Sequence, residues 1–158
     1  MKDKTQKNIR LCCFIALAFC LVWAVSMVVN FTANLFGTNA ALHPIDWTKN
    51  TFMKVVVVFC YVAGTIALIT LCVMAVINIL KGLRENIAFP KSNEKLMFWI
   101  ALADFICLLG IWNLQVLWDD NLKLILTTDI FITPFSLLFF AFMYKVAADA
   151  VEENSLTV

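Results

Sequence analysis

Residues 55–80 read VVVVFCYVAGTIALITLCVMAVINIL, and this stretch contains no charged side chain. An α-helix rises about 1.5 Å per residue, so about 20 residues are enough to cross a hydrocarbon core of roughly 30 Å. The stretch can therefore span a membrane as one helix, with length to spare for tilting or for projecting into water. It predicts an integral membrane protein.

Three further apolar stretches, at residues 11–29, 96–118 and 122–144, are each about long enough to cross a bilayer. Hydrophobic residues make up 63% of the chain and charged residues only 15%, whereas about a quarter of the residues of soluble domains are charged. The first stretch is longer than an ordinary signal-peptide core and no small-residue cleavage motif follows it, so we expect it to remain as the first span. We predict an all-α, polytopic membrane protein whose single domain, residues 1–158, is a bundle of four transmembrane helices.

Basic residues indicate how the four helices are oriented, because Lys and Arg near helix ends favour the cytoplasmic side. Of the 12 Lys and Arg residues, nine precede the first span, lie between the second and third spans, or follow the fourth. The remaining three lie in the other two loops. This asymmetry predicts that both termini and the loop at residues 81–95 are cytoplasmic, and that the protein is located in the cell (inner or plasma) membrane.

The residue types that carry chemistry argue against an enzyme. All six cysteines lie in the apolar stretches, where we expect free thiols that pack as small hydrophobic groups and not disulfides. His43 is the only histidine, the four glycines are isolated, and the sequence contains no nucleophile–base pair and no phosphate-binding glycine loop. We therefore expect no catalytic site, no cofactor and no metal site.

Asp104 and Asp129 are the only acids inside the apolar stretches. An ionised carboxylate at membrane depth costs about 2.5–3.5 kcal/mol, so such a group usually faces the bundle interior and has a partner. Apart from Lys123, at the outer edge of the fourth stretch, no Lys or Arg lies inside these stretches, so we expect each acid to accept hydrogen bonds from neutral groups or to stay protonated. A tight turn between the last two spans would bring Asn113 and Gln115 near the level of Asp129, which predicts an Asn113–Asp129 contact. These groups form either a polar pocket on a proton-linked path or interhelical hydrogen bonds that hold the bundle together.

The loop between the second and third spans and the acidic C-terminal tail form a small cytoplasmic surface. Asn86 is expected to end the second helix in a left-handed conformation, and Ser92 or Asn93 to cap the third. Phe89 offers an aromatic ring that packs under the bundle or holds a partner. The candidate docking residues are Phe89, Asn93, Glu152, Glu153, Asn154 and Leu156.

These two segments resemble a family of small bacterial four-helix membrane proteins of unknown function. The family loop has the form G-x-P-F-x-x-x-N; Phe89 and Asn93 match its Phe and Asn, while Asn86 and Ala88 stand where the family has Gly and Pro. The family ends in E-E-N-D-L-T-[IV], and residues 152–158 read EENSLTV. The resemblance implies a partner, a small helix-turn-helix regulator encoded beside the membrane protein.

Two functional hypotheses follow, with an enzyme as the disfavoured third. The first is a non-enzymatic membrane sensor, anchor or anti-regulator that holds a cytoplasmic helix-turn-helix regulator through the loop and the tail, without contacting nucleic acid itself. The alternative is a small transporter or channel subunit that uses Asp104 and Asp129. That alternative calls for a homo-oligomer, because one four-helix bundle leaves little room for a pathway. In both hypotheses the lipid bilayer surrounds the four membrane-spanning helices.

Overall fold

The computed structural model describes residues 3–36, 45–87, 89–118 and 124–156, and its long elements are all helices. They are α1 (Asp3–Phe36), α3 (Thr51–Arg84), α4 (Asn93–Trp112) and α5 (Asp129–Leu156), with a short 3₁₀-helix, η1 (Leu114–Leu117), after α4. Each long helix is long and apolar enough to cross a membrane. The predicted all-α fold with four membrane-spanning helices is confirmed.

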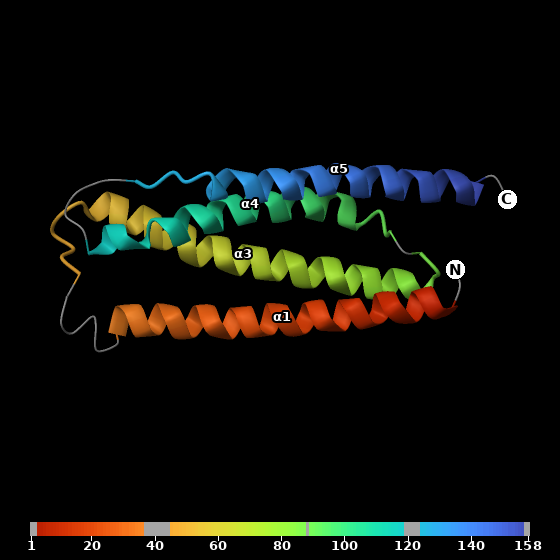
Figure 1. The fold of residues 1–158 in the computed structure, drawn as a ribbon, viewed down its shortest axis with the longest axis horizontal. Coiled ribbons are helices and arrows are strands. Elements are labelled where there is room, and N and C mark those ends of the chain that lie inside the picture. The colour runs from red at the N-terminus through yellow and green to blue at the C-terminus, as the bar shows by residue number, and fades with distance from the viewer. Residues whose placement is uncertain (1–2, 37–44, 88, 119–123, 157–158) are drawn as a thin grey trace.

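Both chain termini lie at the same end of the molecule (Figure 1). We call this the terminal end; it contains the start of α1, the end of α3, the start of α4 and the end of α5. The α3–α4 loop also lies there, whereas η1 and the segment that leads into α5 lie at the opposite end. The four helices therefore alternate in direction along the chain, as successive membrane crossings require.

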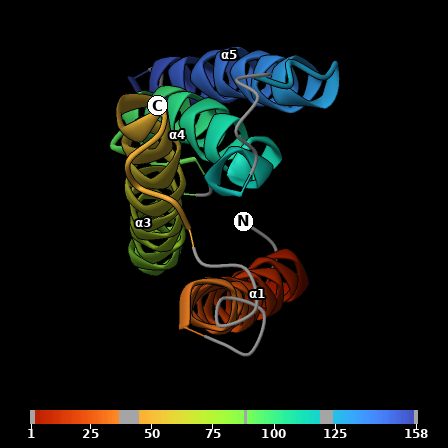
Figure 2. The same ribbon diagram turned by 90° about the vertical axis from the view of Figure 1, so that its left-hand side faces the viewer.

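The helices pack in chain order and form an open assembly. Among the described elements, α1 contacts α3 alone, α4 packs between α3 and α5, and α5 contacts α4 alone. Figure 2 shows α1 and α5 on opposite sides of the assembly, with α3 and α4 between them. Helix α1 thus depends on α3 for all of its helix–helix packing.

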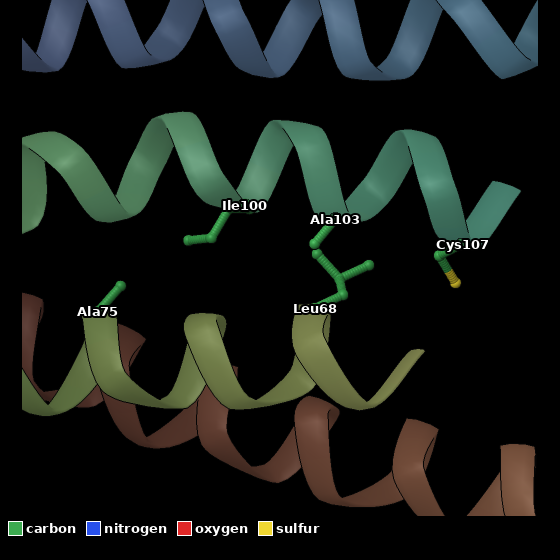
Figure 3. Packing of buried hydrophobic residues seen from close by; sticks show 5 residues of the cluster. All are labelled: Leu68, Ala75, Ile100, Ala103 and Cys107. Carbon is green, nitrogen blue, oxygen red and sulfur yellow. The ribbon is translucent and has the colours of Figure 1, made fainter. Parts of the chain in front are cut away.

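The core lies between α3 and α4, where five small or branched side chains meet (Figure 3): Leu68, Ala75, Ile100, Ala103 and Cys107. Two glycines allow the backbones to approach closely at this crossing. A Cβ atom at Gly110 would lie 2.3 Å from the backbone nitrogen of Tyr61, and one at Gly64 would lie 2.6 Å from that of Cys107. Small residues have this role in membranes, where van der Waals packing between helices replaces the hydrophobic effect.

The ends of the last two membrane helices differ from the prediction. Helix α4 ends at Trp112 and not at residue 118, and α5 begins at Asp129 and not at residue 122. The connection is therefore much longer than the predicted tight turn, part of which (residues 119–123) falls outside the described residues. The predicted pairing of these helices side by side is confirmed, since α4 and α5 pack along each other.

Helix α3 ends in a Schellman motif, which satisfies two of its last carbonyl groups. Asn86 has a φ of 61°, the backbone N–H of Ile87 donates to the Gly82 carbonyl at 2.9 Å, and that of Asn86 donates to the Leu83 carbonyl at 3.4 Å. The predicted left-handed Asn86 is confirmed.

Ser92 occupies the N-cap position of α4 without a side-chain hydrogen bond. Ala88 lies outside the described residues.

Candidate functional site

Asn93 ties α3 to the start of α4 at the terminal end. It is fully buried, its Nδ2 donates to the Ala75 carbonyl at 2.8 Å, and its Oδ1 accepts from Asn78 Nδ2 at 2.9 Å. Buried polar groups require such partners, because an unpaired one costs about 1–3 kcal/mol. The side chain is therefore not exposed to a partner, and we assign Asn93 to the fold and not to docking.

An aromatic pair joins the α3–α4 loop to α5. Phe89 and Tyr144 pack edge to face with their ring centroids 5.6 Å apart, and the Tyr144 hydroxyl donates to the Pro90 carbonyl at 3.0 Å. Phe89 nevertheless remains 41% exposed. The predicted docking residue thus has one face packed under the helices and another open to a partner.

Two ion pairs extend the same connection toward the end of α5. Lys91 Nζ lies 2.5 Å from Glu152 Oε2, and Lys145 Nζ lies 3.3 Å from Glu94 Oε1. The hydrogen bond to the Glu152 carboxylate raises the pKa of Lys91 above its ordinary value. Exposed pairs of this kind contribute little to the free energy of unfolding, because solvent screens them. Their role is therefore to position the loop against α5 more than to stabilise the fold.

These contacts enclose a groove, which we call the terminal groove, between the end of α3, the loop and the end of α5. It has a volume of about 410 Å³. Apolar side chains and a rim of both charge signs line it, among them Lys81, Glu85, Phe89, Lys91, Val151 and Glu152. Glu153 is exposed on α5 next to the groove, and the side chains of Asn154 and Leu156 lie outside the described part of the structure. The groove brings two of the predicted docking residues, Phe89 and Glu152, into one surface.

Asp104 lies within α4, part-way through its predicted membrane span. One of its oxygens, Oδ2, is buried and has no hydrogen-bond partner among the described residues. The thiols of Cys72 on α3 and Cys107 on α4 lie close enough to Asp104 to interact with its charge. Asp104 therefore faces the packed side of α4, as predicted for an acid in a membrane span.

Asp129 has a different environment, because it is exposed in the first turn of α5. A negative charge there interacts favourably with the N-terminal end of the helix dipole. The two acids lie at similar levels, because the rings of Phe105 and Phe131 pack with their centroids 5.9 Å apart. Their environments differ, since Asp104 has a buried oxygen on the packed side of α4 whereas Asp129 is exposed, so they do not share one buried polar pocket.

The predicted contact between Asn113 and Asp129 is wrong. Asn113 is buried, its Oδ1 accepts from the backbone N–H of Ile125 at 2.7 Å, and its Nδ2 donates to the carbonyls of Ile125 and Leu109 at 3.1 and 2.9 Å. The side chain therefore holds the extended segment before α5 through that segment's backbone. Gln115 is exposed on η1 and belongs to no such cluster.

Lys54 is a buried cation that was not expected from the sequence. Its side chain in the first turn of α3 is only 1% exposed, and Nζ donates to the Asp46 carbonyl at 2.7 Å. The Asp46 carboxylate accepts hydrogen bonds from the hydroxyl and the backbone N–H of Thr48, which lower its pKa. Lys54 directly precedes the apolar stretch at residues 55–80, and the count of basic residues assigned it only to a loop.

The chain matches no known protein-family model, no curated protein and no solved structure.

Proposed function

We propose that this protein is a non-enzymatic membrane anchor or sensor that holds a cytoplasmic regulatory protein at the terminal groove. The observation that supports this most is the length of α5, which continues to Leu156, well past the apolar stretch that ends at residue 144. Tyr144, at the end of the apolar stretch, donates a hydrogen bond to Pro90 of the α3–α4 loop, and the extension itself contacts this loop through the Lys91–Glu152 pair. A preformed, partly apolar groove with a charged rim suits a segment of a protein partner.

The orientation of the helices is part of the proposal. Nine of the 12 Lys and Arg residues belong to segments at the terminal end, so the positive-inside rule places that end and both termini in the cytoplasm of the cell membrane. Lipid covers most of the remaining surface. The terminal end must therefore carry the contact with any cytoplasmic partner.

A small helix-turn-helix regulator is the partner that the sequence resemblance favours. We propose that it binds the terminal groove while its own domain contacts DNA, and that the membrane protein contacts no nucleic acid. A groove of about 410 Å³ accommodates only a short segment of a partner. An aromatic anchor such as Phe89 would then supply much of the affinity, as central aromatic residues do in small interfaces.

Removal of residues 152–158 tests this proposal. The deletion removes Glu152 from the groove lining and with it the Lys91–Glu152 pair, so we expect the co-expressed product of the adjacent reading frame to move from the membrane to the soluble fraction, with at least a tenfold loss of membrane-bound partner. Fractionation and immunoblotting measure this. Insertion of the membrane protein should be unchanged, because the four apolar helices determine it.

The matched control is Glu94→Gln, which breaks the Lys145–Glu94 pair outside the groove lining. It should leave the partner on the membrane. Equal retention of the partner by the wild type and by the deletion variant would contradict docking at the terminal groove.

A second candidate function is proton-linked transport through Asp104. The observation in its favour is the buried Oδ2 atom, which has no hydrogen-bond partner among the described residues and so is suited to carry a proton. A pathway would call for a homo-oligomer, because the single chain forms an open row of helices. Asp104-dependent proton flux in vesicles, unaffected by changes at the terminal groove, would favour this function.

A further inference from the structure

Two charged side chains on the α3 side of the terminal groove, Lys81 and Glu85, have no partner among the described residues. Both line the groove, and their spacing along the chain places them one turn apart on the same face of the helix. Both are exposed, and within the described part of the chain neither side chain makes an ion pair or a hydrogen bond. The base precedes the acid along the helix, which is the less favourable order for a pair at this spacing. The groove therefore presents one cation and one anion side by side.

The rest of the groove lining, from the α3–α4 loop and α5, differs in character. Lys91 and Glu152 are paired with each other, whereas the apolar side chains of Phe89 and Val151 line the groove and remain 41% and 38% exposed. Val151 lies about 10 Å beyond residue 144, where the apolar stretch ends, on the helical rise per residue. We therefore place this apolar surface outside the hydrocarbon region, where an exposed apolar patch with a polar rim is typical of a protein-binding site.

We propose that the occupant of the terminal groove is a short amphipathic helix of the partner protein, with one aliphatic anchor and, one turn apart, one acid and one base. The anchor packs between Phe89 and Val151, the acid pairs with Lys81 and the base pairs with Glu85. This is the helix-in-groove mode of recognition. The inference rests on the proposed docking function and adds to it the chemistry of the segment that docks.

The combination of charges and apolar side chains argues against smaller occupants. An inorganic ion is attracted by one of Lys81 and Glu85 and repelled by the other, so the two side chains do not form an ion site. A small zwitterion matches both charges but leaves Phe89 and Val151 exposed to water. A peptide segment pairs with both charges and also covers the apolar side chains.

Three helical peptides that differ in charge test the proposal on the full-length protein in nanodiscs of zwitterionic lipid. Each peptide carries a leucine and, on the same face, two charged positions one turn apart, which are glutamate and lysine, two glutamates, or two lysines. Fluorescence anisotropy measures their binding, with empty nanodiscs as the blank. We expect the wild type to bind the mixed peptide about fivefold more tightly than either of the others, because each of those places like charges together at Lys81 or Glu85.

Charge reversal at the groove should change this preference. Lys81→Glu leaves two acids on the α3 side, so we expect the variant to prefer the two-lysine peptide by about fivefold. Arg84→Glu is the matched control, because it changes the net charge equally at an exposed residue of the same helix end that does not line the groove. It should keep the wild-type preference. The same preference in both variants, or no preference in the wild type, would overturn the proposal.

The leucine of the mixed peptide tests the aliphatic anchor. Its replacement by alanine should weaken binding about tenfold, because a buried apolar anchor supplies much of the affinity of a small interface. Equal binding of the alanine peptide, or displacement of the leucine peptide by an equal concentration of free glycine, would overturn the proposal and indicate a site for a small zwitterion.

This result can be distinguished from that of the proposed function, which is measured by release of the regulator from the membrane. Release of the regulator on deletion of residues 152–158, without any peptide preference, would contradict this inference alone. The expected peptide preferences together with a regulator that the deletion variant retains would support the charge pattern of the groove and contradict only the docking of that regulator.

Discussion

Replacing Gly110 by leucine is expected to separate α3 from α4 and to remove most of the folded protein. Even a Cβ atom at this position would lie 2.3 Å from the nitrogen and 2.5 Å from the Cα of Tyr61. These are backbone atoms, so no side-chain rotation relieves the clash. Overpacking a well-packed core costs about 1–3 kcal/mol and occasionally more, and we expect this substitution at the upper end. Thermal unfolding in detergent, followed by size-exclusion chromatography, measures the loss.

The control for this prediction is Ala18→Leu, which adds a larger side chain at an exposed, lipid-facing site on α1. Its melting temperature should stay close to that of the wild type. If Gly110→Leu melted at the wild-type temperature, the close contact between α3 and α4 would be contradicted.

Replacing Asn93 by leucine is expected to loosen the terminal end. The substitution preserves size but removes the hydrogen bonds to Asn78 and to the Ala75 carbonyl, and it leaves the Asn78 amide without its buried partner. An unsatisfied buried group costs about 1–3 kcal/mol, which corresponds to about a tenfold or greater increase in local opening. We expect trypsin to cleave after Arg84 and Lys91 about ten times faster in the detergent-solubilised variant.

Ser92→Ala is the matched control, because Ser92 is exposed and its side chain makes no capping hydrogen bond. Its cleavage rate should equal that of the wild type. If Asn93→Leu were cut no faster than Ser92→Ala, Asn93 would not hold the loop.

The number, order and class of the helices were predictable because each membrane crossing needs about 20 apolar residues in one run. The helix ends were less predictable, since the apolar run continues through Leu114, Val116 and Leu117 after α4 has ended. The buried Asn113 and its bonds to Ile125 explain the difference. A polar side chain inside an apolar run can stop a helix when it has a backbone partner elsewhere, and hydropathy alone does not identify that partner.

The candidate site was predictable in part. Phe89 and Glu152 were singled out from the sequence, and the structure places both on the terminal groove. Their partners, Tyr144 and Lys91, could not be identified, because residues 89 and 144 or 91 and 152 meet only when α5 folds back along α4. The level of Asp129 was also misjudged, because it was counted from a turn that does not exist at the predicted position.

Site-specific photo-crosslinking in intact cells tests the central proposal most directly. A photoreactive residue at position 151, which lines the terminal groove and is 38% exposed in the wild type, is compared with one at position 146, which is 65% exposed on α5 but does not line the groove. We predict that position 151 crosslinks the cytoplasmic product of the adjacent reading frame and that position 146 does not. Crosslinking of position 151 to lipid alone, or equal crosslinking of that product from both positions, would contradict docking at the terminal groove.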